Sequence, residues 1–123
     1  MKSPEDICAD FPEWPTSWKG LDEDVEYGKS LIEVLRPFVE HLIGTGLKNE
    51  TIRYHMDNLW LLGGEIIRNV SLYEEYSIPA NEKLKDSVDL NGGPRCRHLT
   101  TEAEIKSFDA TCRKLHKFLG AIT

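Results

Sequence analysis

The stretch GTGLKNETIRYHMDNLWLLGG, residues 44–64, decides the fold, because it leads from a glycine-rich turn into a run with helical periodicity. From residue 52 onward apolar residues return at steps of four and three, the spacing of one buried face of an α-helix. The pattern continues beyond the quoted stretch and predicts a helix over about 49–70. Its buried face consists of Ile52, Met56, Leu59, Gly63, Ile66 and Val70.

Two adjacent glycines, Gly63 and Gly64, stand inside this predicted helix. They lower helix stability by about 2 kcal/mol relative to two alanines, so the fold should gain something in return. A local break that redirects residues 65–69 is one explanation, and close approach of a neighbouring helix is the other. The period runs through the glycines without a phase shift, which favours close approach. We expect the first long helix or the last helix to pass near Gly63.

Two further segments show the same periodicity, one before the quoted stretch and one near the end of the chain. Asp22 is the expected N-cap of the first, and Pro37 should kink or restart it. Thr101 and Glu104 fit a capping box at the start of the second. The segments and their apolar positions are 22–44, with Val25, Gly28, Leu31, Ile32, Leu35, Phe38, Val39 and Leu42, and 101–119, with Ile105, Phe108, Cys112, Leu115 and Leu119.

No segment alternates with the period of a β-strand. A weaker amphipathic pattern over residues 80–90 adds a short helix, and the NGGP turn at 91–94 separates it from the last helix. The predicted fold class is therefore all-α, a compact bundle of four to five helices.

Residues 1–20 lack helical periodicity and interleave aromatic residues with prolines. Proline denies this stretch a continuous helix, so we expect an extended Pro/Trp-rich arm that packs on one helical domain of residues 21–123. Trp14 and Trp18 either cover grooves of that domain or remain exposed for a partner. Burial is favoured, because two exposed indole rings would promote aggregation.

Length and composition indicate one globular domain. The chain has 123 residues, of which 40% are hydrophobic and 29% charged. No apolar run approaches the ~18 residues of a membrane span, and the acidic N-terminus MKSPEDICADF is unlike a signal peptide. The three cysteines, an odd number, are typical of reduced thiols. We expect a soluble cytoplasmic protein that does not bind a membrane.

The formal net charge of −6 is unevenly distributed. Residues 1–26 hold two Lys and eight Asp or Glu, whereas residues 95–123 hold six Lys or Arg and three acids. A basic face is therefore compatible with this acidic chain, but the overall charge disfavours nucleic-acid binding, which depends on neutralising phosphates. The residues that would contact DNA are Lys48, Arg53, Arg95, Arg97, Arg113 and Lys117.

Four residues near the C-terminus could form a zinc site. Cys96 and His98 share a loop, and Cys112 and His116 stand four apart on the last predicted helix. Two Cys and two His can bind zinc tetrahedrally. However, the Cys-x-His spacing is unusual, and Cys112 falls on the apolar face, where a free cysteine packs as a small core residue. Core packing is favoured, and no metal or cofactor is predicted.

Glu65 is the acid with the most apolar neighbours in the sequence, and Arg68 follows it one helical turn later. An acid with a shifted pKa in a cleft would suit acid–base catalysis, but a structural ion pair between Glu65 and Arg68 explains the pattern equally well. The sequence contains no glycine-rich phosphate loop, nucleophile elbow or Asp-x-Asp cluster. We therefore do not expect an enzyme.

The first helical hairpin resembles the core-binding domain at the N-terminus of tyrosine recombinases. The resemblance is carried by Phe38, His41, Leu42, Gly46, Leu47, Thr51, Ile52, Tyr54 and Leu59. It covers about 25 residues and implies a DNA-associated accessory domain, although Lys48 stands where that family has a capping Ser. The recombinase catalytic residues do not follow. The chain as a whole, with NLWLLGG at 58–64 and SFDATCRKLHKFL at 107–119, also looks like small bacterial proteins for which we know no activity.

The outward row of the second helix is unusually apolar for a solvated face. It holds Arg53, Asp57, Trp60 and Ile67. We expect the N-terminal arm to bury Trp60, with a second subunit as the alternative cover. The favoured function is a non-enzymatic protein-interaction module, which binds a protein partner or forms a homodimer. The interaction candidates are Trp14, Trp18, Arg53, Trp60 and Ile67.

Overall fold

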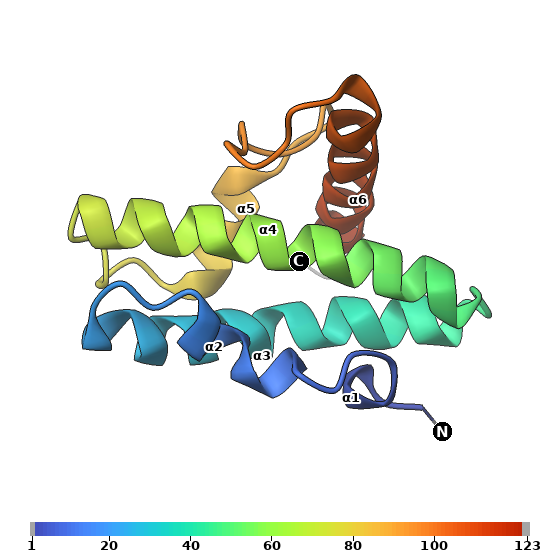
Figure 1. Ribbon diagram of the computed structural model, residues 1–123, viewed down its shortest axis with the longest axis horizontal. Coiled ribbons are helices and arrows are strands. Elements are labelled where there is room, and N and C mark those ends of the chain that lie inside the picture. The colour runs from blue at the N-terminus through green and yellow to red at the C-terminus, as the bar shows by residue number, and fades with distance from the viewer. Residues whose placement is uncertain (1, 122–123) are drawn as a thin grey trace.

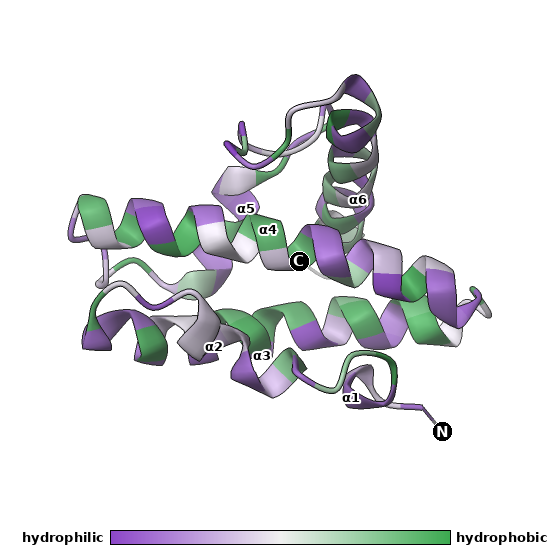
Figure 2. Ribbon diagram, viewed as in Figure 1, coloured by the Kyte–Doolittle hydropathy of each residue, from purple (hydrophilic) through white to green (hydrophobic). Residues whose placement is uncertain are grey.

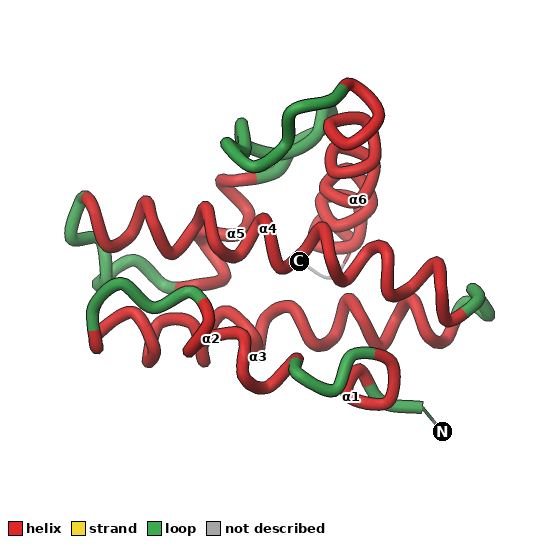
Figure 3. Tube along the Cα trace, in the orientation of Figure 1, coloured by secondary structure: helices red, strands yellow, loops and turns green. Residues whose placement is uncertain are grey.

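Helices α3 and α4 form the centre of the structure, and the other helices pack against one or both of them (Figure 1). The computed structural model describes residues 2–121, and these form six α-helices and one 3-10 turn. The described residues contain no strand (Figure 3), apart from an isolated bridge between Asp89 and Gly92. The elements are α1 (Pro4–Ile7), η1 (Phe11–Glu13), α2 (Trp14–Ser17), α3 (Asp22–Gly44), α4 (Asn49–Leu72), α5 (Ala80–Ser87) and α6 (Glu102–Ala121).

Helices α3 and α4 form a long antiparallel hairpin, as the sequence predicts. Gly46 turns the chain between them with φ +81°, a conformation that favours glycine. Helix α3 continues through Pro37 as one element, so of the two predicted effects, a kink or a restart, the restart does not occur. Asp22 is also not the N-cap, because α3 begins at Asp22 itself and Asp24 caps it from within the first turn.

The buried face of α4 is wider than the single stripe read from the sequence. All six predicted residues of that stripe are buried, and so are Leu62, Glu65 and Ile67. Ile67 was predicted to face outward, but only 1% of it is exposed. The reason is that α3, α5 and α6 contact α4 along different sides, which buries a broader arc of its surface.

Helix α6 runs across the direction of α3 and α4 (Figure 1) and begins at the predicted capping box. The Thr101 Oγ1 accepts from the Glu104 N–H at 3.1 Å, and Glu104 Oε1 accepts from the Thr101 N–H at 3.1 Å. Phe108, Cys112 and Leu115 are buried as predicted. Ile105, by contrast, is 43% exposed because it lies in the first turn of α6.

A buried polar network joins α6 to α4. His55 Nδ1 lies 2.7 Å from Thr111 Oγ1, and Asn58 Nδ2 donates to the same oxygen at 2.9 Å. Asn58 also donates to the backbone oxygen of Ser107. Burial lowers the pKa of His55, and the positive charge of Lys114 lowers it further. The neutral imidazole is therefore the form that fits between the two helices.

The N-terminal segment is not the extended arm that the sequence suggests. It consists of three short helical turns, α1, η1 and α2, each with a proline in its first turn. At that position the missing N–H of proline breaks no helical hydrogen bond. Proline therefore separates the short turns without preventing helix formation within them. The segment packs on the body as expected, because Phe11 is fully buried and only 2% of Trp14 is exposed. Arg36 holds it by a bidentate pair with Glu5.

The close approach to Gly63 comes from this N-terminal segment and not from a long helix. A Cβ atom added to Gly63 would overlap Cζ2 of Trp18. At Gly64 the nearest Trp18 atom would lie 3.4 Å away, which is an ordinary contact. The prediction of close packing at Gly63 is therefore confirmed, but the predicted partner was wrong.

Each long helix carries both apolar and polar residues along its whole length (Figure 2). Within residues 2–121, no helix combines the length and apolar character that crossing a lipid bilayer requires.

The two glycines should respond in opposite ways to alanine. Gly63→Ala should destabilise the protein by about 1–2 kcal/mol, because overpacking against Trp18 exceeds the helix-propensity gain of ~1 kcal/mol. Gly64→Ala is the matched control and should raise the melting temperature. In a Trp18→Ala background, Gly63→Ala should become stabilising. Urea denaturation measures the free energy of unfolding of Gly63→Ala, Gly64→Ala, Trp18→Ala and the double variant. Equal effects at both glycines would contradict the packing described here.

His55 should make stability depend on pH. Its pKa is lower in the folded chain than the ordinary value of 6.5, so below that pH the unfolded chain binds a proton that the folded chain does not. This contribution is complete above the unfolded pKa and is lost as pH falls toward the folded pKa. We expect the free energy of unfolding to fall more steeply from about pH 7.5 to about pH 5.5 in the wild type than in His55→Gln. Parallel pH profiles would show that His55 is not responsible.

Candidate functional site

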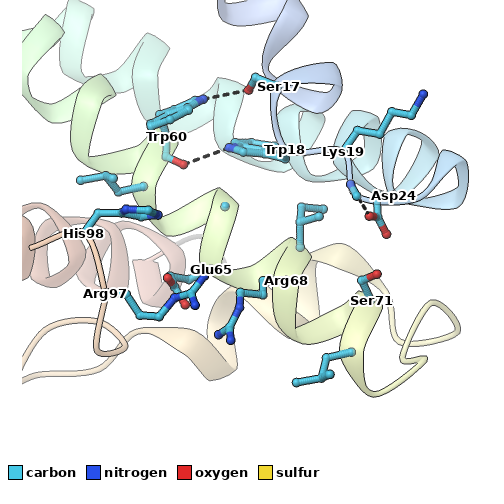
Figure 4. A pocket seen from close by; sticks show the side chains of 15 residues that line it. Ser17, Trp18, Lys19, Asp24, Trp60, Glu65, Arg68, Ser71, Arg97 and His98 are labelled. Carbon is cyan, nitrogen blue, oxygen red and sulfur yellow. Dashed lines mark hydrogen bonds between the residues drawn. The ribbon is translucent and has the colours of Figure 1, made fainter.

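A groove of about 460 Å³ lies where the N-terminal segment, α4 and the loop before α6 meet (Figure 4). We call it the tryptophan groove. Its apolar side chains are Trp18, which follows α2, and residues of α4. Its polar side chains come from α2, α3 and α4 and from the loops before α3 and α6. The lining includes Ser17, Trp18, Lys19, Gly20, Asp24, Trp60, Leu61, Gly64, Glu65, Ile67, Arg68, Ser71, Leu72, Arg97 and His98.

Two hydrogen bonds between α2 and α4 position the tryptophan pair (Figure 4). Trp18 Nε1 donates to the backbone oxygen of Trp60 at 3.0 Å, and Trp60 Nε1 donates to Ser17 Oγ at 2.9 Å. Ser17 Oγ in turn donates to the Trp14 oxygen at 2.6 Å. Both indole N–H groups are thus satisfied inside the protein. The rings are held in place before any ligand binds.

Asp24 builds the wall of the groove at the start of α3. Its carboxylate accepts from the N–H groups of Gly20 and Leu21 at 2.9 and 2.8 Å, and from the Tyr76 hydroxyl at 2.7 Å. Burial by itself would raise the pKa of Asp24, but these hydrogen bonds outweigh it and lower the pKa below its ordinary value. Asp24 is only 1% exposed and is fully engaged in structure, so it is not available to a ligand.

The opposite side of the groove is basic. In Figure 4, Arg97 and His98 lie across the view from Lys19 and Asp24. Lys19 forms an exposed ion pair with Asp22 at 2.9 Å, whereas the ion pairs among residues 2–121 include neither Arg68 nor Arg97. Both arginines are exposed. Two cations without an acidic partner therefore line this side.

The loop that carries Arg97 and His98 contains a buried cysteine. Cys96 is 5% exposed and its thiol interacts with Glu65 on α4. Burial raises the pKa of Cys96, and the negative charge of Glu65 raises it further. Of the ion pairs between described residues, none joins Glu65 to Arg68, so the suggested structural ion pair is not formed. Glu65 instead lies close enough to the Cys96 thiol to influence its pKa.

The interaction candidates differ in how deeply they are buried and in which segments they contact. The arm reaches Trp60 as predicted, but 40% of Trp60 remains exposed, so the expectation that it is largely buried is wrong. The cause is that the Trp18 ring packs at Gly63 and its Nε1 bonds the backbone oxygen of Trp60, so Trp18 does not cover the Trp60 ring. Trp14 belongs to the core. Arg53 points to the N-terminal segment, where it donates to the Ile7 oxygen at 3.3 Å.

Four of the six basic residues of the DNA interpretation line four different hollows. Arg97 lines the tryptophan groove, and Arg53 lines a separate hollow with Cys8 and Asp10. Lys117 lines a third, beside Phe38 and Phe118. Arg95 lines a fourth, under the loop before α6. These positions do not build one continuous hollow.

The four zinc candidates do not assemble into one cluster. Cys112 is 1% exposed, and burial raises its pKa to about 12, so it packs as a protonated thiol in the core. Cys96 is buried beside Glu65, whereas His98 faces the tryptophan groove. Among residues 2–121, no three His, Cys, Asp or Glu side chains are arranged to hold a metal ion.

Comparison of the chain with protein-family models, with curated proteins and with solved structures gives no match in any of the three. The site must therefore be interpreted from its own geometry.

Sequence reasoning missed most of the groove. Lys19 and Leu72 line it but lie far apart in sequence, and neither belongs to a motif. The available signal was the Gly63–Gly64 pair. Two adjacent glycines leave room for a large side chain from another segment to pack against α4, so they indicated where an aromatic segment would dock. Leu72 is 63% exposed, which a helical stripe ending at residue 70 does not indicate.

Trp60 and Trp14 should differ in their importance for stability. Trp60→Ala should destabilise the protein by only about 1–2 kcal/mol, because much of the ring already contacts solvent. Trp14→Ala should cost about 3–5 kcal/mol, since it empties a core position. Thermal and urea denaturation measure both effects. A loss at Trp60 as large as that at Trp14 would mean that Trp60 is a core residue.

Proposed function

We propose that this protein is a non-enzymatic protein-interaction module, and that it docks an acidic polypeptide segment of a partner in the tryptophan groove. The observation that carries the proposal is Trp60, which is held by a hydrogen bond and is still 40% exposed. Tryptophan and arginine are the residues that most often dominate binding energy at protein interfaces. A groove that presents both is suited to bind a polypeptide.

The apolar part of the groove defines one half of the ligand. Trp60 and Leu72 are exposed by 40% and 63%, and the partly buried Leu61 also lines the groove. A bulky apolar side chain of a partner would remove this surface from water. Because the indole rings are already fixed by Ser17 and by the backbone, docking would require little ordering of the groove.

The basic part defines the other half. Arg68 and Arg97 lie at the groove without an ion pair among the described residues, and guanidinium groups bind carboxylates with two parallel hydrogen bonds. Lys19 and His98 add further donors. The partner segment that fits best is therefore acidic around its apolar anchor.

A peptide selection tests this function. Random peptides displayed on phage should be enriched on the wild-type protein for segments with a bulky apolar residue and nearby acids. A synthetic copy of an enriched peptide should bind Trp60→Ala at least about tenfold more weakly, the loss of one strong interface contact. Leu90→Ala is the matched control, because Leu90 is 79% exposed but lines no part of the groove.

Two results would contradict the proposal. One is equal binding of the peptide to the wild type and to Trp60→Ala. The other is binding of duplex DNA that weakens steeply with salt, which would favour the DNA-associated alternative.

A further inference from the structure

The tryptophan groove has an acidic edge on the side opposite its cationic one. Gly20 and Asp24 line the groove, and Leu21, Asp22 and Glu23 between them are exposed. Leu21 is 53% exposed, an unusual value for a leucine that follows directly after a lining residue. The start of α3 thus presents an apolar side chain followed by two carboxylates at the border of the groove.

This segment has the chemistry that the groove is suited to bind. The groove presents apolar surface at Trp60 and Leu72, and unpaired cations at Arg68 and Arg97. The ion pair between Asp22 and Lys19 does not prevent Asp22 from binding elsewhere, because its side chain is 94% exposed and such surface pairs contribute little. Glu23 forms none of the ion pairs found among residues 2–121.

The segment cannot fill the groove of its own chain. Leu21 is the N-cap of α3, and its position is fixed by the hydrogen bond from its N–H to Asp24. Figure 4 shows Asp24 and Lys19 on one side of the groove and Arg97 on the other. An acidic edge and a cationic edge on either side of one apolar groove form a self-complementary surface, which is what a two-fold dimer requires.

We infer that the chain forms a symmetric homodimer in which residues 21–23 of each copy dock in the tryptophan groove of the other. Leu21 lies against Trp60 of the second copy. Asp22 and Glu23 pair with its Arg68 and Arg97. The inference rests on the proposed docking function of the groove and names a second copy of this chain as an occupant.

A charge-swap experiment tests the dimer. One variant carries Arg68→Glu and Arg97→Glu, and the other carries Asp22→Arg and Glu23→Arg. Each variant alone places like charges at both contacts and should weaken dimerisation at least about tenfold. In an equimolar mixture both contacts join opposite charges again, so a mixed dimer should form. Analytical ultracentrifugation from micromolar to millimolar concentration measures the masses, and circular dichroism checks that each variant is folded.

Two controls make the result specific. Lys85→Glu with Asp86→Arg changes the same kinds of charge on α5, away from the groove lining, and should leave dimerisation unchanged. Raising the salt concentration should weaken the wild-type dimer, because its ion pairs lie near the surface. Leu21→Ala should also weaken it, with little change in salt dependence.

Three outcomes would overturn the inference. These are a wild type that stays monomeric at every concentration, a dimer that survives both charge reversals, and a mixture that does not form mixed dimers. If the wild type is monomeric while selected peptides still bind the groove, self-association is wrong and the docking function stands. If the dimer forms as described, selected peptides should compete with it.

Discussion

The contact between the Trp18 ring and the bare backbone of Gly63 is the one on which the candidate site depends. Any side chain at residue 63 would occupy the space of the indole ring. With the ring in place, Trp18 Nε1 reaches the Trp60 oxygen and α2 is fixed against α4. The helix-propensity penalty of two glycines is thereby offset by the burial of an aromatic surface. The same contact leaves Trp60 beside the N-terminal segment and not beneath it.

The helical framework could be predicted from the sequence because periodicity reports burial directly. The bounds of α3 agree with the predicted 22–44, and the capping box of α6 forms as expected. The failures occurred where burial depends on more than one neighbour. Ile67 is buried because α4 is surrounded, and Pro12 and Pro15 begin short helical turns where an extended chain was expected. A periodic pattern describes one face of one helix and carries no information on how many partners that helix has.

The candidate site was less predictable than the fold, for a physical reason. Its residues come from α2, the start of α3, the C-terminal half of α4 and the loop before α6, and no local pattern links these segments. Trp60 was identified because an indole on an outward face stands out in the sequence. Arg68 and Arg97 were not grouped with it, since whether an arginine has an acidic partner depends on tertiary contacts alone. Glu65 shows the same limit, because its partner is Cys96, thirty-one positions away in the printed sequence.

The uneven distribution of charge along the sequence is also found at the surface of the tryptophan groove. The excess of acids lies in residues 1–26, and the excess of bases lies near the C-terminus. In a folded chain such segments usually neutralise each other, yet Arg36 with Glu5 is the only bidentate Arg–carboxylate pair among the described residues, and it lies within the N-terminal half. The acids at the start of α3 and the arginines at the groove form no ion pair with each other among the described residues, and Asp24 fixes the start of α3 by hydrogen bonds to the Gly20 and Leu21 N–H groups. Opposite charges that are held apart on one rigid surface can be satisfied only by another molecule or by solvent. This separation, more than the apolar area, is the reason why we propose the tryptophan groove as a binding surface.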